Sequence, residues 1–168
     1  MEDTMGNYEK GLSILAEKFG NNKDNVISLA TISLDPAAGG KPCPVVRDVD
    51  AYYEGDAFYV VTYGESNKMK QIAQNDSVAI AVCFEWFTAS GIGENLGWVL
   101  EPKNAALRDK LRTTFAAWYD MANNENDKNC CILAIKMANG IINLNHHETL
   151  IHMDFINKEA SVSGKPLE

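Results

Sequence analysis

The sequence lacks the features that would place it in a membrane or in an oxidising compartment. It contains no run of 18 or more apolar residues, so no segment is expected to span a membrane. The first ten residues are acidic and polar, and they do not resemble a secretion signal. The four cysteines form no Cys-x-x-Cys pair, and we interpret them as reduced, structural thiols of a cytoplasmic protein.

Positive charge is also scarce. Fifteen Lys and Arg stand against 23 Asp and Glu, which gives a formal net charge of −8. Nucleic acids and anionic membranes both require a basic footprint, so neither is expected as a partner. Cations that gather at one place in such an acidic chain are therefore informative.

Motifs of common catalytic and metal sites are missing too. No Gly-x-Ser-x-Gly or Cys–His pattern suggests a nucleophile. His146, His147 and His152 have only Glu148 and Asp154 nearby, and we expect no metal site. Trp86, Phe87 and Trp98 favour a core or a dimer interface over a stack against a cofactor.

The pattern that is present predicts one domain over residues 1–168, with several short strands and a few helices. An N-terminal helix region is expected within 1–24, and a loose tail over 157–168. Helices are predicted over 8–19 with Asn7 as a cap, from Gly64 to Asp76, and over 102–123. Strands are predicted over 26–34, 45–53, 57–63, 77–84, 91–100, 130–137, 141–144 and 149–155. Asn139-Gly140 is the predicted turn of a hairpin. Short connections favour antiparallel pairing, so the expected fold is mainly β with flanking helices (α+β), a small antiparallel barrel.

Two cations stand near the ends of neighbouring predicted strands. Arg47 lies between Val46 and Val49 in an apolar strand, where it needs a partner. It could instead form a salt bridge with Asp48 or Asp50, or occupy an exposed edge. Lys68 follows Ser66 at the start of a helix, a place that attracts anions. An ordinary Ser cap with a solvated lysine is the alternative there. Together the two cations indicate a phosphate site.

These residues belong to a longer pattern that resembles the FMN-binding core of the pyridoxamine 5'-phosphate oxidase-like split barrels. The similarity covers about a third of the chain, from Ile27 to Phe84. It rests on Arg47-Asp48-Val49, Gly55, Phe58-Tyr59-Val60-Val61-Thr62, Ser66-Asn67-Lys68, Gln71-Ile72 and Asn75. Asn67 replaces an Arg that is frequent in the family, and Tyr52 replaces a Lys of the true oxidases. The C-terminal substrate motif of those oxidases is absent, so vitamin B6 is not the expected substrate. The chain looks more like the general stress protein and nitroimidazole reductase types.

The resemblance implies a split β-barrel that binds flavin mononucleotide (FMN) between the subunits of a homodimer. The phosphate would be bound by Arg47 and by the Ser66-Asn67-Lys68 loop, in which Ser66 and Lys68 donate to it. Val61 and Thr62 would line the ribityl chain and ring, and the backbone of Asp48, Val49 and Asp50 would face the polar edge of the ring. The partner subunit would contribute from residues 86–98.

The function expected from this resemblance is an oxidoreductase. It would transfer electrons from a nicotinamide cofactor or another reductant to a small organic acceptor. FMN carries out such chemistry itself, so no catalytic residue is assigned. A non-enzymatic flavin or haem carrier or sensor of the same fold is the first alternative. A barrel that has lost its ligand and serves as an interaction module is the second.

Overall fold

The computed structural model describes residues 6–167 of the chain. Within this range, eight strands form one antiparallel sheet in the order β3-β2-β1-β4-β5-β6-β7-β8. The strands are β1 Asn25–Ile32, β2 Pro44–Glu54, β3 Ala57–Tyr63, β4 Ser77–Val82, β5 Phe87–Trp98, β6 Cys130–Leu144, β7 Thr149–Asp154 and β8 Glu159–Gly164. The helices are α1 Asn7–Phe19, α2 Asn67–Gln74, α3 Ala105–Thr114 and α4 Tyr119–Ala122, with 3-10 turns at η1 Ala38–Gly40 and η2 Pro102–Asn104.

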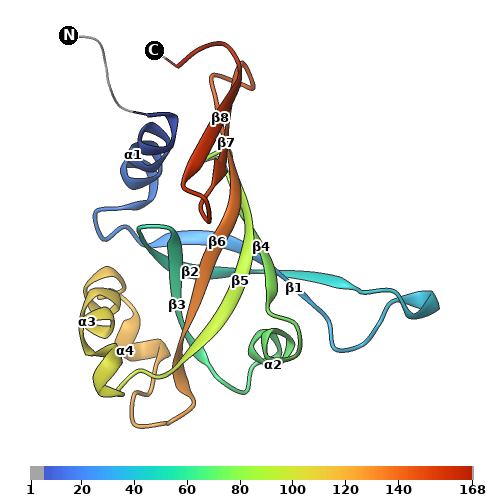
Figure 1. Ribbon diagram of the computed structural model, residues 1–168. Helices are drawn as coiled ribbons and strands as arrows, with labels where there is room; N and C mark the ends of the chain where they lie inside the picture. Colours follow the sequence, from blue (N-terminus) through green and yellow to red (C-terminus); the bar gives the residue numbers. More distant parts are fainter. Residues whose placement is uncertain (1–5, 168) are drawn as a thin grey trace.

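The sheet closes on itself because β3 pairs with two neighbours. One is β2, across the hairpin turn at Gly55-Asp56, and the other is β6, with Val60 opposite Leu133. Strands β3-β2-β1-β4-β5-β6 therefore form a barrel, and β7 and β8 extend the sheet beyond it (Figure 1). The expected antiparallel barrel with flanking helices is confirmed.

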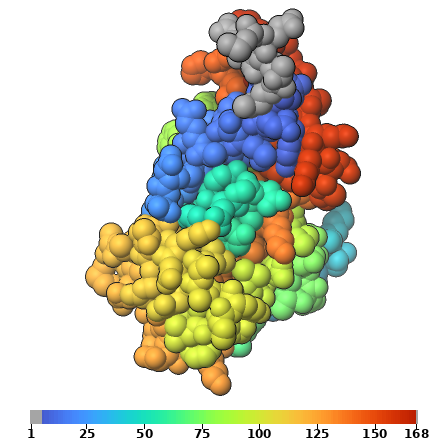
Figure 2. Space-filling view, turned by 60° about the vertical axis from the view of Figure 1, so that its left-hand side comes forward, coloured from blue at the N-terminus to red at the C-terminus, as the bar shows by residue number. Residues whose placement is uncertain are grey.

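The core has two parts, separated by the wall of the barrel. Alternation along β3 sends Phe58 and Val60 inward, where they join a cluster that includes residues of α1 and α2. The next side chains, Tyr59 and Val61, point outward and are covered by Leu111 of α3. Figure 2 shows α3 (yellow) covering this side of the barrel below α1 (blue). Both faces of β3 are thus packed, which agrees with the uninterrupted apolar and β-branched character of residues 57–63.

The long helix predicted over 102–123 is wrong in one respect, because it is broken. It starts as η2, continues as α3, and stops before Phe115, whose φ of −101° and ψ of 21° leave the helical range. A turn follows, in which the rings of Phe115 and Trp118 stack with their centroids 4.7 Å apart. Helix α4 then begins at Tyr119. Phe115 and Tyr119 both remain buried in the outer cluster. Their spacing of four therefore mimics a continuous helix although the backbone turns between them.

The hairpin predicted at Asn139-Gly140 is also wrong, because β6 runs without interruption from Cys130 to Leu144. Gly140 lies opposite Ala89 of β5 and Met153 of β7, so the strand is paired on both sides at this point. A Cβ on Gly140 would lie 3.1 Å from the rings of Phe87 and Phe155. The glycine therefore serves close packing rather than a turn.

Three smaller corrections concern the ends of elements. The tail predicted to be loose forms β8, in which Val162 pairs with Ile151 and packs against the core. The predicted strand over 91–100 begins earlier, at Phe87. The position before the first helix is Gly6, and Asn7 is already helical. The first five residues of the expected N-terminal region, and residue 168, lie outside the described residues.

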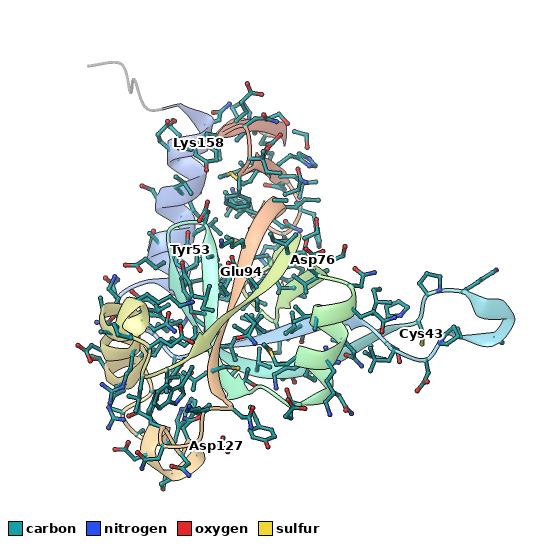
Figure 3. All side chains as sticks on the ribbon, turned by 60° about the horizontal axis from the view of Figure 1, so that its bottom comes forward. Cys43, Tyr53, Asp76, Glu94, Asp127 and Lys158 are labelled. Carbon is teal, nitrogen blue, oxygen red and sulfur yellow. The ribbon has the colours of Figure 1, made fainter. Side chains whose placement is uncertain are left out.

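The connection between β1 and β2 forms an arm. Residues 33–43 continue the two strands away from the barrel, and Cys43 lies on this arm (Figures 1 and 3). No helix within residues 6–167 is long and apolar enough to cross a membrane.

Candidate functional site

Arg47 is held on the inner side of β2 by neutral oxygen atoms. Its Nη1 donates to Oγ1 of Thr31 at 2.5 Å and to the carbonyl oxygen of Leu29 at 3.3 Å, both on β1. Its Nη2 donates to Oε1 of Gln71 on α2 at 2.9 Å. Within residues 6–167 no carboxylate pairs with the guanidinium, so neither the salt bridge nor the exposed edge position describes Arg47.

Lys68 brings a second cation to the same place. It lies in the first turn of α2 and is half-buried. Burial lowers the pKa of its ammonium, and the charge of Arg47 lowers this pKa further. Burial also lowers the pKa of Arg47. No hydrogen bond or ion pair from the part of the chain that the structure describes compensates Lys68. Two cations therefore share a partly desolvated place, which costs free energy unless an anion joins them.

Ser66 adds a hydroxyl group that has no partner. It occupies the N-cap position of α2, with φ −68° and ψ 155°, but its side chain makes no capping hydrogen bond. The Oγ atom is buried and lacks a hydrogen-bond partner among the described residues. A buried unpaired hydroxyl costs about 1–3 kcal/mol, so a ligand oxygen here would stabilise the site. The alternative of an ordinary Ser cap is not what the structure shows.

Thr62 and Val61, at the end of β3, face in opposite directions. Thr62 is buried on the inner side, and its carbonyl oxygen accepts a hydrogen bond from Sγ of Cys131 at 3.4 Å. The charge of Lys68 acts on this thiol, which places Thr62 and Cys131 close to the two cations. The side chain of Val61 points into the outer cluster instead, so only its backbone faces the inner side.

The remaining predicted site residues surround this arrangement. Asp48 and Asp50 point to the exposed side of β2, away from Arg47, and Asp48 accepts a hydrogen bond from Oγ of Ser28 at 2.7 Å. Val49 packs against the inner core. Asn67, which opens α2, is exposed. Strand alternation thus keeps both carboxylates off the side that carries the cation.

The sequence reasoning missed the two residues that fix Arg47. Thr31 and Gln71 are both buried, and Oγ1 of Thr31 also donates to Oε1 of Gln71 at 2.6 Å. Gln71 follows Lys68 by three positions on α2, which puts both side chains on one face of the helix. This spacing, and the presence of the polar Gln71 in the apolar stripe of the helix, were the sequence signals that could have identified Gln71 as a site residue.

The aromatic and ligand-type residues elsewhere have other surroundings. Phe87 is buried in the inner core, and Trp98 packs against the outer cluster. Trp86 is half exposed, with its ring centroid 5.1 Å from that of His147. Within the described residues no three His, Cys, Asp or Glu side chains gather as a metal site would require.

All four cysteines are free thiols. Cys130 and Cys131 are buried, whereas Cys83 is exposed and Cys43 is intermediate. Burial raises the pKa of Cys130 to about 11, so its thiol stays protonated at neutral pH.

The comparisons with known proteins bear on the fold. No family model matches the sequence, and no curated protein matches it. Among solved structures, a pyridoxamine 5'-phosphate oxidase-related, FMN-binding protein from Nostoc punctiforme matches with a TM-score of 0.59 and 13% identity. The match covers 98% of this chain and 99% of that one.

Two further structures agree with this match. A haem-binding protein from Mycobacterium smegmatis has a TM-score of 0.62 and 15% identity over 92% of this chain, but the chain spans only 60% of its length. General stress protein 26 from Bacillus anthracis has a TM-score of 0.51 and 18% identity over 75% of this chain and 91% of its own. The chain thus has the fold of the pyridoxamine 5'-phosphate oxidase-like split barrels, as its resemblance to them implied.

Proposed function

We propose that this protein is an FMN-binding flavoprotein whose phosphate site consists of Arg47, Lys68 and Ser66. One observation carries the proposal: two half-buried cations and a buried, unpartnered hydroxyl lie near the N-terminus of α2, and no carboxylate of residues 6–167 pairs with either cation. A helix N-terminus binds anions through its free N–H groups and its dipole. A phosphate monoester, with a charge of about −1.5 to −2 at pH 7, matches two cations.

The flavin would extend from this phosphate along the neighbouring strands. Val61 and Thr62 would contact the ribityl chain, and the backbone of Asp48, Val49 and Asp50 would face the polar edge of the ring. Asn67 would stand beside the phosphate, at the first position of α2. The similarity in fold to an FMN-binding protein supports this placement.

The activity that we propose is an oxidoreduction. FMN, when bound, exchanges electrons with a reductant and an acceptor. The proposed reductant is a nicotinamide cofactor or another small donor, and the proposed acceptor is a small organic molecule. The residues of this chain bind and orient the flavin, and no side chain is assigned as an acid or a base. We further propose that the protein acts in the cytoplasm, which its four free thiols support.

A homodimer with the flavin between the subunits is part of the proposal. The outer face of the sheet exposes apolar side chains: Val26, Val46, Phe84, Trp86 and Ile141. Exposed apolar groups that gather in this way are typical of interaction surfaces. Residues 86–98 of the partner subunit would then complete the ring site.

A non-enzymatic carrier or sensor of flavin or haem is the second candidate. The haem-binding protein from M. smegmatis has a similar fold, which supports haem as an alternative ligand to FMN. Bound FMN that neither NADH nor NADPH reduces would favour this candidate. Visible spectra recorded after adding FMN, or haem, separate the two cofactors.

The experiment that tests the proposal compares flavin retention in matched variants. The wild type, incubated with FMN and freed of excess, should keep the absorption bands of oxidised flavin. Arg47→Ala with Lys68→Ala should lose at least about ten-fold in FMN affinity, because two charge-assisted contacts disappear. Lys70→Ala with Lys103→Ala removes the same charge from exposed positions and should retain the flavin. A wild type that holds no FMN, or equal retention in both double variants, contradicts the proposal.

A further inference from the structure

Gln71 on α2 joins Thr31, on the inner side of the barrel, to Arg47, one of the two cations of the candidate phosphate site. Its Oε1 atom accepts two hydrogen bonds, at 2.9 Å from Nη2 of Arg47 and at 2.6 Å from Oγ1 of Thr31. Gln71 and Thr31 are both buried, with 8% and 1% of their surface exposed. The three residues form a closed ring of contacts, because Thr31 Oγ1 also accepts a hydrogen bond from Nη1 of Arg47.

These hydrogen bonds are unusual for a half-buried guanidinium, because no acceptor carries a charge. Partly buried arginines are usually paired with a carboxylate, which both orients and neutralises them. In the same chain, Arg108 and Arg112 follow that rule and share Glu125. Arg47 is oriented just as fully, by Leu29, Thr31 and Gln71, but all its acceptors are neutral. Its full charge is therefore available to a ligand.

We propose that Gln71 is a positioning and specificity-determining residue, which fixes Arg47 without neutralising it and so makes the site selective for flavins that carry a phosphate monoester. The inference rests on the proposed flavin function and deepens it. Glutamine is the neutral isostere of glutamate, so a single oxygen-for-nitrogen exchange at position 71 decides the charge of the site. With Gln71, Arg47 and Lys68 contribute two positive charges, which match a doubly ionised monoester. Riboflavin lacks that group, and the diphosphate of FAD has one charge on each phosphate.

Placing a carboxylate at position 71 would change this balance. It would form an ion pair with Arg47 through Nη2, and its charge would repel the ligand phosphate across a partly desolvated space. The geometry of Arg47 would be kept, since both side chains have the same shape. Affinity for FMN should fall while affinity for riboflavin should not.

The experiment compares Gln71→Glu with Gln74→Glu, an exposed position on the same helix that introduces the same charge. Dissociation constants for FMN and riboflavin are measured by quenching of flavin fluorescence. Gln71→Glu should weaken FMN binding by about ten- to hundred-fold and leave riboflavin binding within about two-fold. Gln74→Glu should change neither constant by more than about two-fold.

A third variant separates charge from hydrogen bonding. Gln71→Leu removes the acceptor but adds no charge, so FMN affinity should fall by only a few-fold, less than in Gln71→Glu. If Gln71→Glu does not fold, Gln71→Leu tests the proposal instead. Its ratio of FMN affinity to riboflavin affinity should fall below that of the wild type. A larger loss in Gln71→Leu than in Gln71→Glu would overturn the charge argument.

The outcomes distinguish the two proposals. Unchanged FMN affinity in Gln71→Glu, or an equal loss for FMN and riboflavin, overturns the role of Gln71 and leaves the flavin function standing. If the wild type binds no FMN, the flavin function fails. Thermal unfolding with inorganic phosphate then tests Gln71 alone: the midpoint should rise with phosphate in the wild type and in Gln74→Glu, but not in Gln71→Glu. A rise of the same size in all three proteins would contradict the inference.

Discussion

Ser66 carries a buried hydroxyl group that no described residue uses. Its Oγ atom is buried without a partner within the described residues, although its backbone has the geometry of a helix N-cap. A side chain that serves only the helix would bond to the free N–H groups of the first turn. Ser66 instead leaves both its hydroxyl and those N–H groups available, next to Lys68.

The variant Ser66→Ala tests this availability. Removing a hydroxyl that lacks a partner should leave the free energy of unfolding unchanged or raise it by up to about 1 kcal/mol. FMN affinity should fall several-fold, because one donor to the phosphate is lost. Denaturant unfolding and flavin titration measure the two quantities. A loss of stability above about 1 kcal/mol without a loss of FMN affinity would identify an ordinary cap.

At the scale of elements, the connection between α4 and β6 is tied to α3 through Glu125. Nε and Nη2 of Arg108 donate to its two carboxylate oxygens at 2.7 and 2.5 Å, and the hydroxyl of Tyr119 donates to Oε1 at 2.9 Å. The backbone oxygen of Glu125 also accepts from Nε1 of Trp98 at 2.7 Å. This network holds the broken helix against the outer cluster.

The network makes the stability of the protein dependent on pH. The hydrogen bond from Arg108 lowers the pKa of Glu125 from 4.5 to about 2. The unfolded chain therefore binds this proton more tightly, and the contribution of Glu125 is present above pH 4.5 and lost as pH falls toward about 2. Glu125→Gln should lower the free energy of unfolding at pH 7 by about 1–3 kcal/mol and flatten its decline below pH 4.5. Denaturant unfolding at a series of pH values measures both.

The control for this prediction lies in the same region. Asp120 also pairs with Arg112, but its side chain is 76% exposed. Asp120→Asn should therefore change the free energy of unfolding by no more than about 0.5 kcal/mol. An equally small effect of Glu125→Gln would show that the network does not hold α3 and the following connection together.

Errors in the predicted elements arose where tertiary packing overrides a local signal. Asn139-Gly140 is a favoured hairpin dipeptide, yet β5 and β7 pair with the chain on both sides of it. Phe115 and Tyr119 keep helical spacing across a turn, because both face the same cluster. By contrast, β3 was predicted with its observed bounds, since its apolar run and its flanking turns agree with the fold.

For the whole molecule, the apolar side chains on the outer face of the sheet are the reason to expect a homodimer. A hollow of about 650 Å³ opens there, lined in part by Ser28, Phe84, Trp86 and Ile141. Val46 on β2 projects from the same side of the sheet as Ser28 on β1 and is 68% exposed. We expect a second copy of the chain to cover this face.

The variant Val46→Asp tests this expectation. Sedimentation should give twice the chain mass of 18.5 kDa for the wild type and the chain mass itself for the variant, because a buried unpaired carboxylate disfavours association. Flavin retention should fall in parallel, because residues 86–98 of the second copy complete the ring site in the dimer that we propose. Met121→Asp, at an exposed apolar residue on α4, should leave both unchanged. A monomeric wild type that retains FMN would rule out the shared site.

The sequence by itself determined the class of fold and pointed to the two cations of the candidate site, because both depend on local patterns. Strand alternation, turn residues and the start of a helix are set by neighbours in the chain, and they predicted Arg47 within a strand and Ser66 and Lys68 at the start of a helix, where the structure has them. Only the tertiary structure decided which side chains meet. Thr31 and Gln71 reach Arg47 because β1 pairs with β2 and α2 packs against β1. Such contacts join residues 16 and 24 positions apart, and no local pattern encodes them.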